Sequence, residues 1–139
     1  MKKLCVYITL LLLASCTTAL EHRVFVESIV NKQNYLDVTL QIEGMNSEEY
    51  NQLKKLSSKR LVCSSSHFNR VDTQVSNFDI NFLESTISIC KNDDNRMCKP
   101  VNISNTPIQL NCQLIFSSML GNTIKSKEFE ILNELGKRQ

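Results

Sequence analysis

The sequence predicts an α+β fold, in which an antiparallel β-sheet of about five strands carries one amphipathic helix packed on a face. Three patterns support this prediction. Apolar and polar residues alternate over 36–42, apolar residues recur at helical spacing from Tyr50 onward, and a second regular alternation runs over 108–116. The expected element order is β-β-α-β-β-β.

The first two strands are expected to form a β-hairpin. Residues 24–30 are rich in β-branched and aromatic side chains, and the polar stretch 31–34 is typical of a turn. Every second residue from Leu36 to Ile42 is then apolar. Period-2 alternation is typical of a strand with one buried face, and Gly44 is expected to end it.

A helix is expected next. Residues 46–49 offer an N-cap and two acidic side chains for the first turn. Tyr50, Leu53 and Leu56 follow at three-residue steps, and Cys63 lies seven residues beyond Leu56 on the same face. The pattern predicts an amphipathic helix of about 14 residues that ends at Cys63. Tyr50, Leu53 and Leu56 are the candidate partner-binding residues.

Further strands are expected after residue 77. Residues 78–82 and 86–89 alternate in two different phases, and the slip between them predicts a bulge, or a turn at 83–84. The polar stretch 91–96 is typical of a turn. The segment 101–103 is expected to begin a short strand.

The last part of the domain contains the clearest of the later strands. The alternation over 108–116 predicts a strand whose buried face carries Cys112. Gly121 and Asn122 indicate a turn. The tail 126–135 fits a helix or a strand equally well, so its conformation stays open.

The N-terminus has the three-part layout of an export signal. A Met-Lys-Lys start precedes an almost wholly apolar stretch over 4–14, and small residues follow over 14–19. The apolar stretch of ~11 residues is too short for a membrane-spanning helix. Removal of Lys2 and Lys3 leaves fourteen basic and fourteen acidic side chains, so the exported domain is neutral. Nucleic acid is therefore not an expected partner.

Four of the six cysteines lie in the exported domain, and an even number there predicts two disulfides. Cys90 and Cys98 flank a polar turn, and pairing Cys63 with Cys112 would join the helix to the sheet. We therefore predict Cys90–Cys98 and Cys63–Cys112. A zinc site or a redox pair would need close cysteine or histidine spacing such as C-x-x-C, which the chain lacks.

The sequence contains no complete catalytic pattern. The neighbouring Ser66 and His67 are not a dyad by sequence proximity alone, and no serine lies in a G-x-S-x-G elbow. With three glycines the chain lacks a phosphate-binding loop, and the Asp93-Asp94 pair lacks the calcium-loop pattern. We therefore expect no enzyme, no catalytic residue, no metal and no small-molecule cofactor.

Leu13-Ala14-Ser15-Cys16 resembles the bacterial lipobox, in which an invariant cysteine receives the lipid. The resemblance implies cleavage before Cys16 and acylation, including palmitate, at that residue. Thr17, in place of an aspartate, resembles the pattern of outer-membrane sorting. Two or three acyl chains give stable anchoring, unlike a single chain.

This resemblance divides the chain into a signal peptide over 1–15, a lipidated N-terminus with a short tether over 16–22, and one domain over 23–139. The first strand is expected within about eight residues of Cys16, and such a tether spans at most ~28 Å. The domain would therefore stay close to the outer membrane and face the periplasm. The alternative is ordinary cleavage after Ala19, which would release a secreted protein.

The layout over residues 23–112 also resembles the AspS/GspS-type pilotins of type II secretion. The likeness lies in a hairpin, a helix ending at Cys63 and a strand cysteine at Cys112. It implies an outer-membrane lipoprotein that binds a secretin segment. The chain differs from that family by adding Cys90 and Cys98.

The leading functional expectation is therefore an accessory lipoprotein of a secretion or pilus assembly system, whose partner is a secretin or a pilus or secretion subunit. It would bind a peptide strand at a sheet edge or an apolar helix in a groove, and the candidate surfaces are the first hairpin and the helix that carries Tyr50. Two alternatives stay open. One is an inhibitor or exclusion lipoprotein, and the other is a secreted, disulfide-bonded binding or virulence protein.

Overall fold

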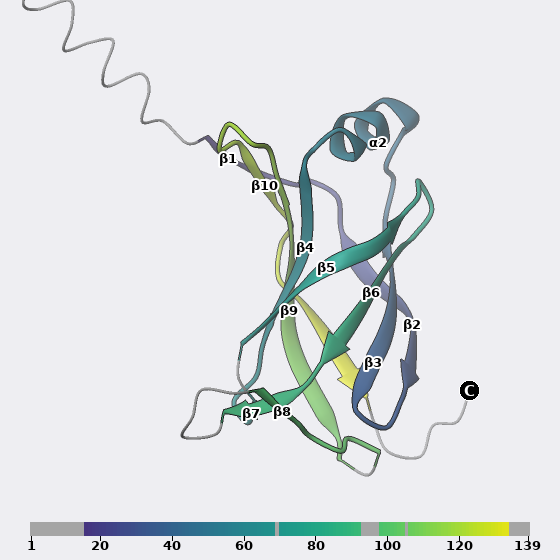
Figure 1. The fold of residues 1–139 in the computed structure, drawn as a ribbon. Helices are drawn as coiled ribbons and strands as arrows, with labels where there is room; N and C mark the ends of the chain where they lie inside the picture. Colours follow the sequence, from purple (N-terminus) through teal and green to yellow (C-terminus); the bar gives the residue numbers. More distant parts are fainter. Residues whose placement is uncertain (1–15, 69, 93–97, 105, 134–139) are drawn as a thin grey trace, which may run out of the picture.

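The computed structural model describes residues 16–68, 70–92, 98–104 and 106–133, with only the backbone at residues 91, 92 and 98. The described residues contain strands and one short helix (Figure 1). Their bounds are β1 (Thr17–Ala19), β2 (Val24–Asn31), β3 (Tyr35–Ile42), α2 (Ser47–Lys54), β4 (Ser58–Ser64), β5 (Val71–Phe78), β6 (Leu83–Ser88), β7 (Cys90–Asn92), β8 (Cys98–Pro100), β9 (Ile108–Ser117), β10 (Thr123–Lys125) and β11 (Phe129–Asn133).

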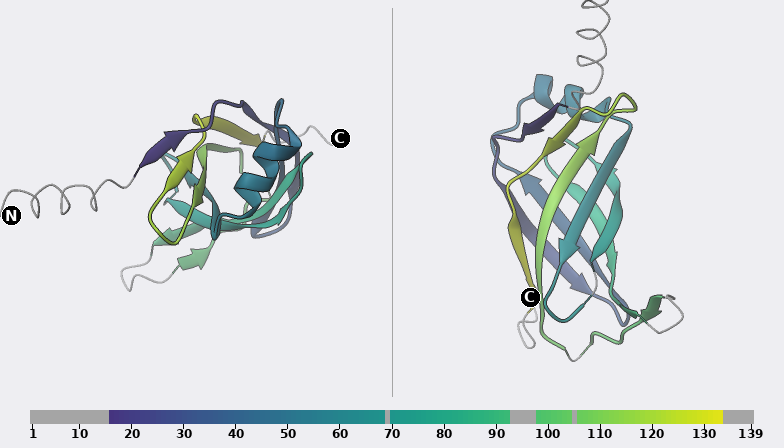
Figure 2. Two further views of the ribbon diagram at one scale, coloured as in Figure 1. Left: turned by 90° about the horizontal axis from the view of Figure 1, so that it is seen from above. Right: turned by 90° about the vertical axis from the view of Figure 1, so that its left-hand side faces the viewer.

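Nine of these strands form one sheet, in the order β1-β10-β9-β4-β5-β6-β3-β2, with β11 paired to the other half of the β9 edge. The ladders are antiparallel except for the parallel pair of β1 and β10. Strands β7 and β8 form a separate two-stranded ribbon. Viewed along its long axis, the sheet curls into a ring, and α2 lies over one end (Figure 2).

The expectation of about five strands in the order β-β-α-β-β-β is wrong, because the described residues already form a nine-stranded sheet and a two-stranded ribbon. The expected 14-residue helix is also wrong, since α2 ends at Lys54 and Cys63 lies in β4. Cys63 fits the helical face of Leu56, seven residues earlier, but it also fits a period-2 strand face together with Leu61. Pairing decides between them, because Leu61 lies opposite Leu114 of β9 and Cys63 lies opposite Cys112. The resemblance to pilotins rested on a helix that ends at Cys63, and the structure has a strand at that position instead.

Several other expectations are confirmed. The first hairpin forms, with Val24 opposite Ile42, and β9 covers the alternation over 108–116. Cys63 and Cys112 form a disulfide between neighbouring strands, with a Cα–Cα distance of 4.1 Å. This is the one disulfide described, where two were expected. The second expected pair involves Cys98, whose side chain lies outside the described residues, so Cys90–Cys98 stays a prediction.

Smaller differences concern the connections. The turn between β5 and β6 lies at 79–82, closed by the bond from Asp79 N–H to Phe82 O at 2.8 Å, rather than at 83–84. The segment 101–103 is not a strand. The tail forms strand β11, because its backbone pairs with the free half of the β9 edge.

The interior of the ring is filled by aliphatic and aromatic side chains. The largest fully buried ones are Phe116, Leu36, Leu40, Leu61, Leu83, Ile87, Ile89, Ile103, Ile108, Leu110, Leu114 and Ile131. No buried side-chain nitrogen or oxygen in the described part of the chain lacks a hydrogen-bond partner. The ring therefore encloses a packed core.

Both ends of the ring are closed. At one end Tyr50 of α2 packs on Phe78, with ring centroids 5.1 Å apart, and Phe78 packs on Phe116 at 5.7 Å. At the other end Ile103 is fully buried, and its N–H donates to Gln33 O at 3.0 Å. The surface features of the molecule must therefore lie along the wall or at the outer faces of these ends.

Candidate functional site

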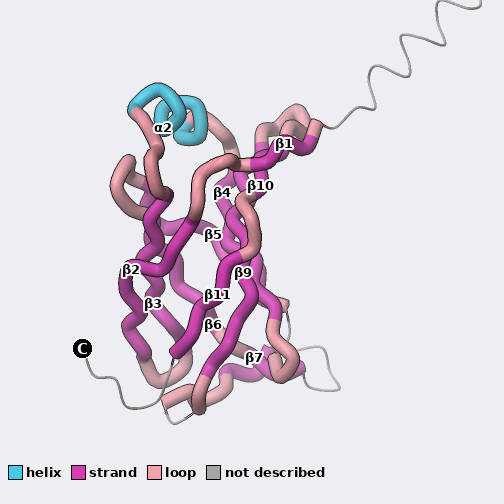
Figure 3. Tube along the Cα trace, turned by 180° about the vertical axis from the view of Figure 1, so that it is seen from behind, coloured by secondary structure: helices cyan, strands magenta, loops and turns pink. Residues whose placement is uncertain are grey.

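The wall of the ring has a seam between β2 and β11. Each of these strands pairs on one side only, β2 with β3 and β11 with β9, and the ladders place no pair between them (Figure 3). The backbone edges that face the seam are therefore free of a strand partner. Free strand edges are the usual template for pairing with another chain.

Strand direction makes closure of the seam less favourable than the antiparallel pairings elsewhere in the wall. Seven strands with alternating directions surround the ring, namely β2, β3, β6, β5, β4, β9 and β11. Because this number is odd, the two strands that meet at the seam run parallel. Parallel pairing is slightly less stable per residue than antiparallel pairing, so closure gains less here than elsewhere in the wall.

Ser126 sets the point where the seam begins. Its N–H donates to Leu114 O, and its Oγ accepts from Leu114 N–H, both at 2.9 Å. The Ser126 carbonyl accepts instead from the Gln113 side chain at 2.7 Å. The β10 ladder ends at Lys125 and β11 begins to pair with β9 at Phe129, so residues 127–128 between them belong to neither ladder. Leu20 N–H donates to Lys125 O at 2.7 Å. The segments that precede β2 and β11 are therefore hydrogen-bonded to each other just before the seam begins.

A cleft of about 520 Å³ lies in the seam. Its apolar wall consists of buried Val24 with half-buried Phe25, Val26 and Phe129. Its rim carries charges of both signs, on Glu21, Arg23, Lys127, Glu128 and Glu130. An apolar wall with a charged rim and free backbone edges is suited to an extended peptide rather than to a phosphate or a metal ion.

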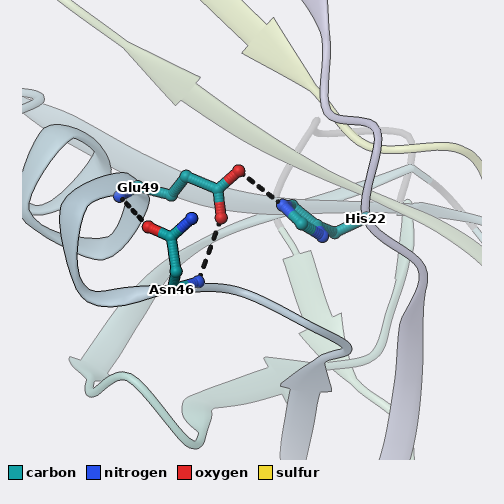
Figure 4. Close-up of polar contacts among 3 residues, drawn as sticks. All are labelled: His22, Asn46 and Glu49. Carbon is teal, nitrogen blue, oxygen red and sulfur yellow. Dashed lines mark hydrogen bonds and ion pairs between the residues drawn. The ribbon is translucent and has the colours of Figure 1, made fainter.

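The strip of chain that leads into the seam is attached to α2. His22 Nε2 lies 2.9 Å from Glu49 Oε1, and Glu49 forms a capping box with Asn46 (Figure 4). In that box Glu49 N–H donates to Asn46 Oδ1 at 2.9 Å, and Asn46 N–H donates to Glu49 Oε2 at 3.0 Å. Two hydrogen bonds hold the pKa of Glu49 below its ordinary value of 4.5. The bond from the Asn46 backbone has the larger effect, and the bond with His22 has the smaller one.

This network predicts a pH-dependent contribution to stability. A carboxyl group whose pKa is lowered by folding stabilises the folded state above its ordinary pKa, and the contribution is lost as the pH falls through the folded pKa. Glu49→Gln is therefore expected to lower the urea midpoint at pH 7 and to have a diminishing effect below about pH 4.5. Urea unfolding across this range checks it, with Glu48→Gln as control. A pH-independent effect of Glu49→Gln would contradict it.

The predicted binding residues of the helix do not lie in the seam. Leu53 is buried with 4% of its surface exposed, and Tyr50 and Leu56 are half-buried against the core. Tyr50 Oη also donates to Phe78 O at 3.3 Å. These side chains close one end of the ring. Their role in binding a partner stays a prediction.

Cys16 has a free, exposed thiol. Residue 17 already belongs to β1, and the Cys16 carbonyl accepts from Thr123 N–H at 3.1 Å. The predicted tether over 16–22 is therefore largely part of the fold, since β1 is paired with β10 and Leu20 is buried.

The comparisons with known proteins return no match: no family model, no curated protein and no solved structure is similar to this chain. Among the described residues no helix is long and apolar enough to cross a membrane, and no group of three or more potential metal ligands is found. Sequence reasoning offered the first hairpin, which contains β2, as a candidate surface, but it missed the seam that β2 forms with β11. The available signal was the run Val24-Phe25-Val26, which does not alternate and so indicates a strand with apolar side chains on both faces.

Proposed function

We propose that this protein is a lipid-anchored protein of the cell envelope that acts by binding another protein, as an accessory factor of a secretion or pilus assembly system. It acts without catalysis. The observation that carries the binding part is the seam, with its two free strand edges beside an apolar wall.

The proposed binding mode is strand addition. An extended segment of the partner pairs with the free edge of β2 or β11, and its side chains contact the apolar wall of Val26, Phe25 and Phe129. Charged residues of both signs on the partner then meet the mixed rim. Because β2 and β11 already approach each other, a short extended segment in the cleft lined by residues 21, 23–26 and 127–130 fits better than a full inserted strand.

The position of β1 supports lipid attachment at Cys16 over ordinary cleavage after Ala19. Cleavage after Ala19 would remove all of β1, which pairs with β10 over three residues. Cleavage before Cys16 leaves this strand intact and keeps the Cys16 carbonyl bonded to Thr123. The folded domain therefore retains β1 only in the lipoprotein alternative.

Lipidation is tested by metabolic labelling of the full-length protein with a clickable palmitate analogue. The wild type is expected to carry the label and to fractionate with the outer membrane. Cys16→Ser is expected to lose both. A mature protein that begins at Leu20 would contradict this proposal and favour the secreted alternative.

Partner binding is tested by photo-crosslinking in the native host. A benzoyl-phenylalanine at position 25 or 129 is expected to form a crosslink to a secretin or to a pilus or secretion subunit. Position 35 is the matched control, because Tyr35 is an exposed aromatic residue of β3 away from the seam. Phe25→Asp is expected to reduce partner recovery. Crosslinks to a foreign enzyme or phage protein would favour the inhibitor alternative, and equal crosslinking from position 35 would contradict the role of the seam.

A further inference from the structure

We propose that the turn between β9 and β10 is a membrane-contacting tip, whose Met119 and Leu120 side chains enter the bilayer surface beside the lipid on Cys16. This inference rests on the proposed lipid attachment and deepens it. Among the described residues, Met119 and Leu120 are the most exposed large apolar side chains, each with 92% of its surface accessible. Exposed apolar side chains grouped at one spot indicate a contact surface.

Hydrogen bonds fix the backbone conformation of the turn that forms the tip. Ser118 N–H donates to Asn122 O at 2.9 Å, and Gly121 N–H donates to Ser118 O at 3.2 Å. The Ser118 hydroxyl also accepts from Asn122 N–H at 3.1 Å, and Gly121 adopts φ 88°, which favours glycine. These bonds fix the backbone on both sides of Met119 and Leu120. Binding of the tip to a surface therefore costs little further conformational entropy of the backbone.

The tip lies beside the predicted lipid attachment point. Thr123, three residues after Leu120, donates its N–H to the Cys16 carbonyl at 3.1 Å, and Thr17 pairs with Thr123 in the β1–β10 ladder. Figure 1 shows the start of β1 next to the β9–β10 turn, at the end of the molecule that also carries α2. A lipid on Cys16 therefore brings this end, and with it the tip, to the membrane surface.

Basic side chains lie at the C-terminal end of α2, and the segment that follows is bonded to the base of the turn, whereas the acidic Glu48 lies in the first turn of that helix. Ser57 Oγ donates to Ser117 O at 3.0 Å, which links the segment after α2 to the base of the turn. Lys54 and Lys55 at that end of α2 are exposed. Lys59 Nζ donates to Leu56 O at 2.8 Å, and burial, with a smaller effect of nearby Lys54, lowers the pKa of this amino group. Lys54 and Lys55 precede Ser57 by three and two residues, so their ammonium groups lie at the end of the molecule that carries the tip, where they can contact anionic headgroups.

The experiment uses tryptophan as a reporter, because the chain contains none. Full-length Leu120→Trp is purified and reconstituted into vesicles of phosphatidylethanolamine and phosphatidylglycerol. Its emission is expected to shift to shorter wavelength and to fall about twofold when brominated phospholipids replace the ordinary ones, as for a side chain at the headgroup–acyl boundary. Val30→Trp is the matched control, since Val30 is 48% exposed near the turn that joins β2 to β3. It is expected to show neither change.

The outcomes separate this inference from the lipid anchor. If Cys16 is acylated but Leu120→Trp is not quenched, the tip proposal is overturned and the anchor stands. If Cys16 carries no acyl group while Leu120→Trp is still quenched, the anchor fails and the tip stands. A concentration-dependent blue shift without vesicles would show that a second copy of the chain covers the tip, and would overturn the proposal.

Discussion

Replacing both Cys63 and Cys112 by alanine is expected to lower the free energy of unfolding by about 4 kcal/mol. The disulfide joins residues 49 positions apart, so its loss frees a long loop in the unfolded chain. Both cysteines are 1% exposed, and removal of their sulfur atoms also loses packing in the core. Urea unfolding followed by far-UV circular dichroism measures the change.

Wild-type protein unfolded in excess reductant is the control for the alanine variant. Its free energy of unfolding is expected to fall as well. The loss is expected to be smaller than in the double alanine variant if the reduced thiols still fill the core. The denaturant slope is expected to rise in both cases, because the unfolded chain becomes more open. A loss below about 1 kcal/mol would mean that the closed loop contributes far less than its length implies.

Phe116→Ala is expected to lower the free energy of unfolding by about 3–5 kcal/mol. The Phe116 ring is fully buried on β9 and packs on Phe78, which in turn packs on Tyr50 of α2. Loss of the Phe116 ring therefore leaves a cavity next to Phe78, the residue on which Tyr50 of α2 packs. The same urea measurement gives the size of the effect.

Phe25→Ala is the matched control, because Phe25 is also an aromatic strand residue but lies half-buried in the seam. Its expected loss is about 1–2 kcal/mol, in proportion to the smaller apolar surface that folding removes from water. Equal losses for the two variants would contradict the assignment of Phe116 to the core and of Phe25 to an open cleft.

These expectations concern stability, whereas the seam and the tip concern partners. The strand edges at the seam lie on the wall, and the β9–β10 turn lies at the end beside Cys16. Under the proposed function the two surfaces would therefore work together. The membrane end would set the orientation of the molecule, and the wall would remain accessible to a partner.

The sequence alone determined the local features of this protein. Alternation over 36–42 and 108–116 predicted β3 and most of β9, since a strand with one buried face leaves a period-2 pattern. The capping pattern at Asn46 and Glu49 predicted where α2 begins, because those side chains satisfy the first backbone groups of a helix. The pairing of Cys63 with Cys112 was also predicted from the sequence.

Only the tertiary structure decided how these elements are arranged. Residues 58–64 became β4 instead of the end of a helix, because β5 and β9 supply backbone partners on both sides, which no local pattern encodes. The tail became β11 because half of the β9 edge was free. The seam itself follows from the count and direction of strands around the ring. That count depends on pairings between distant residues, and so the site we propose was invisible to sequence reasoning.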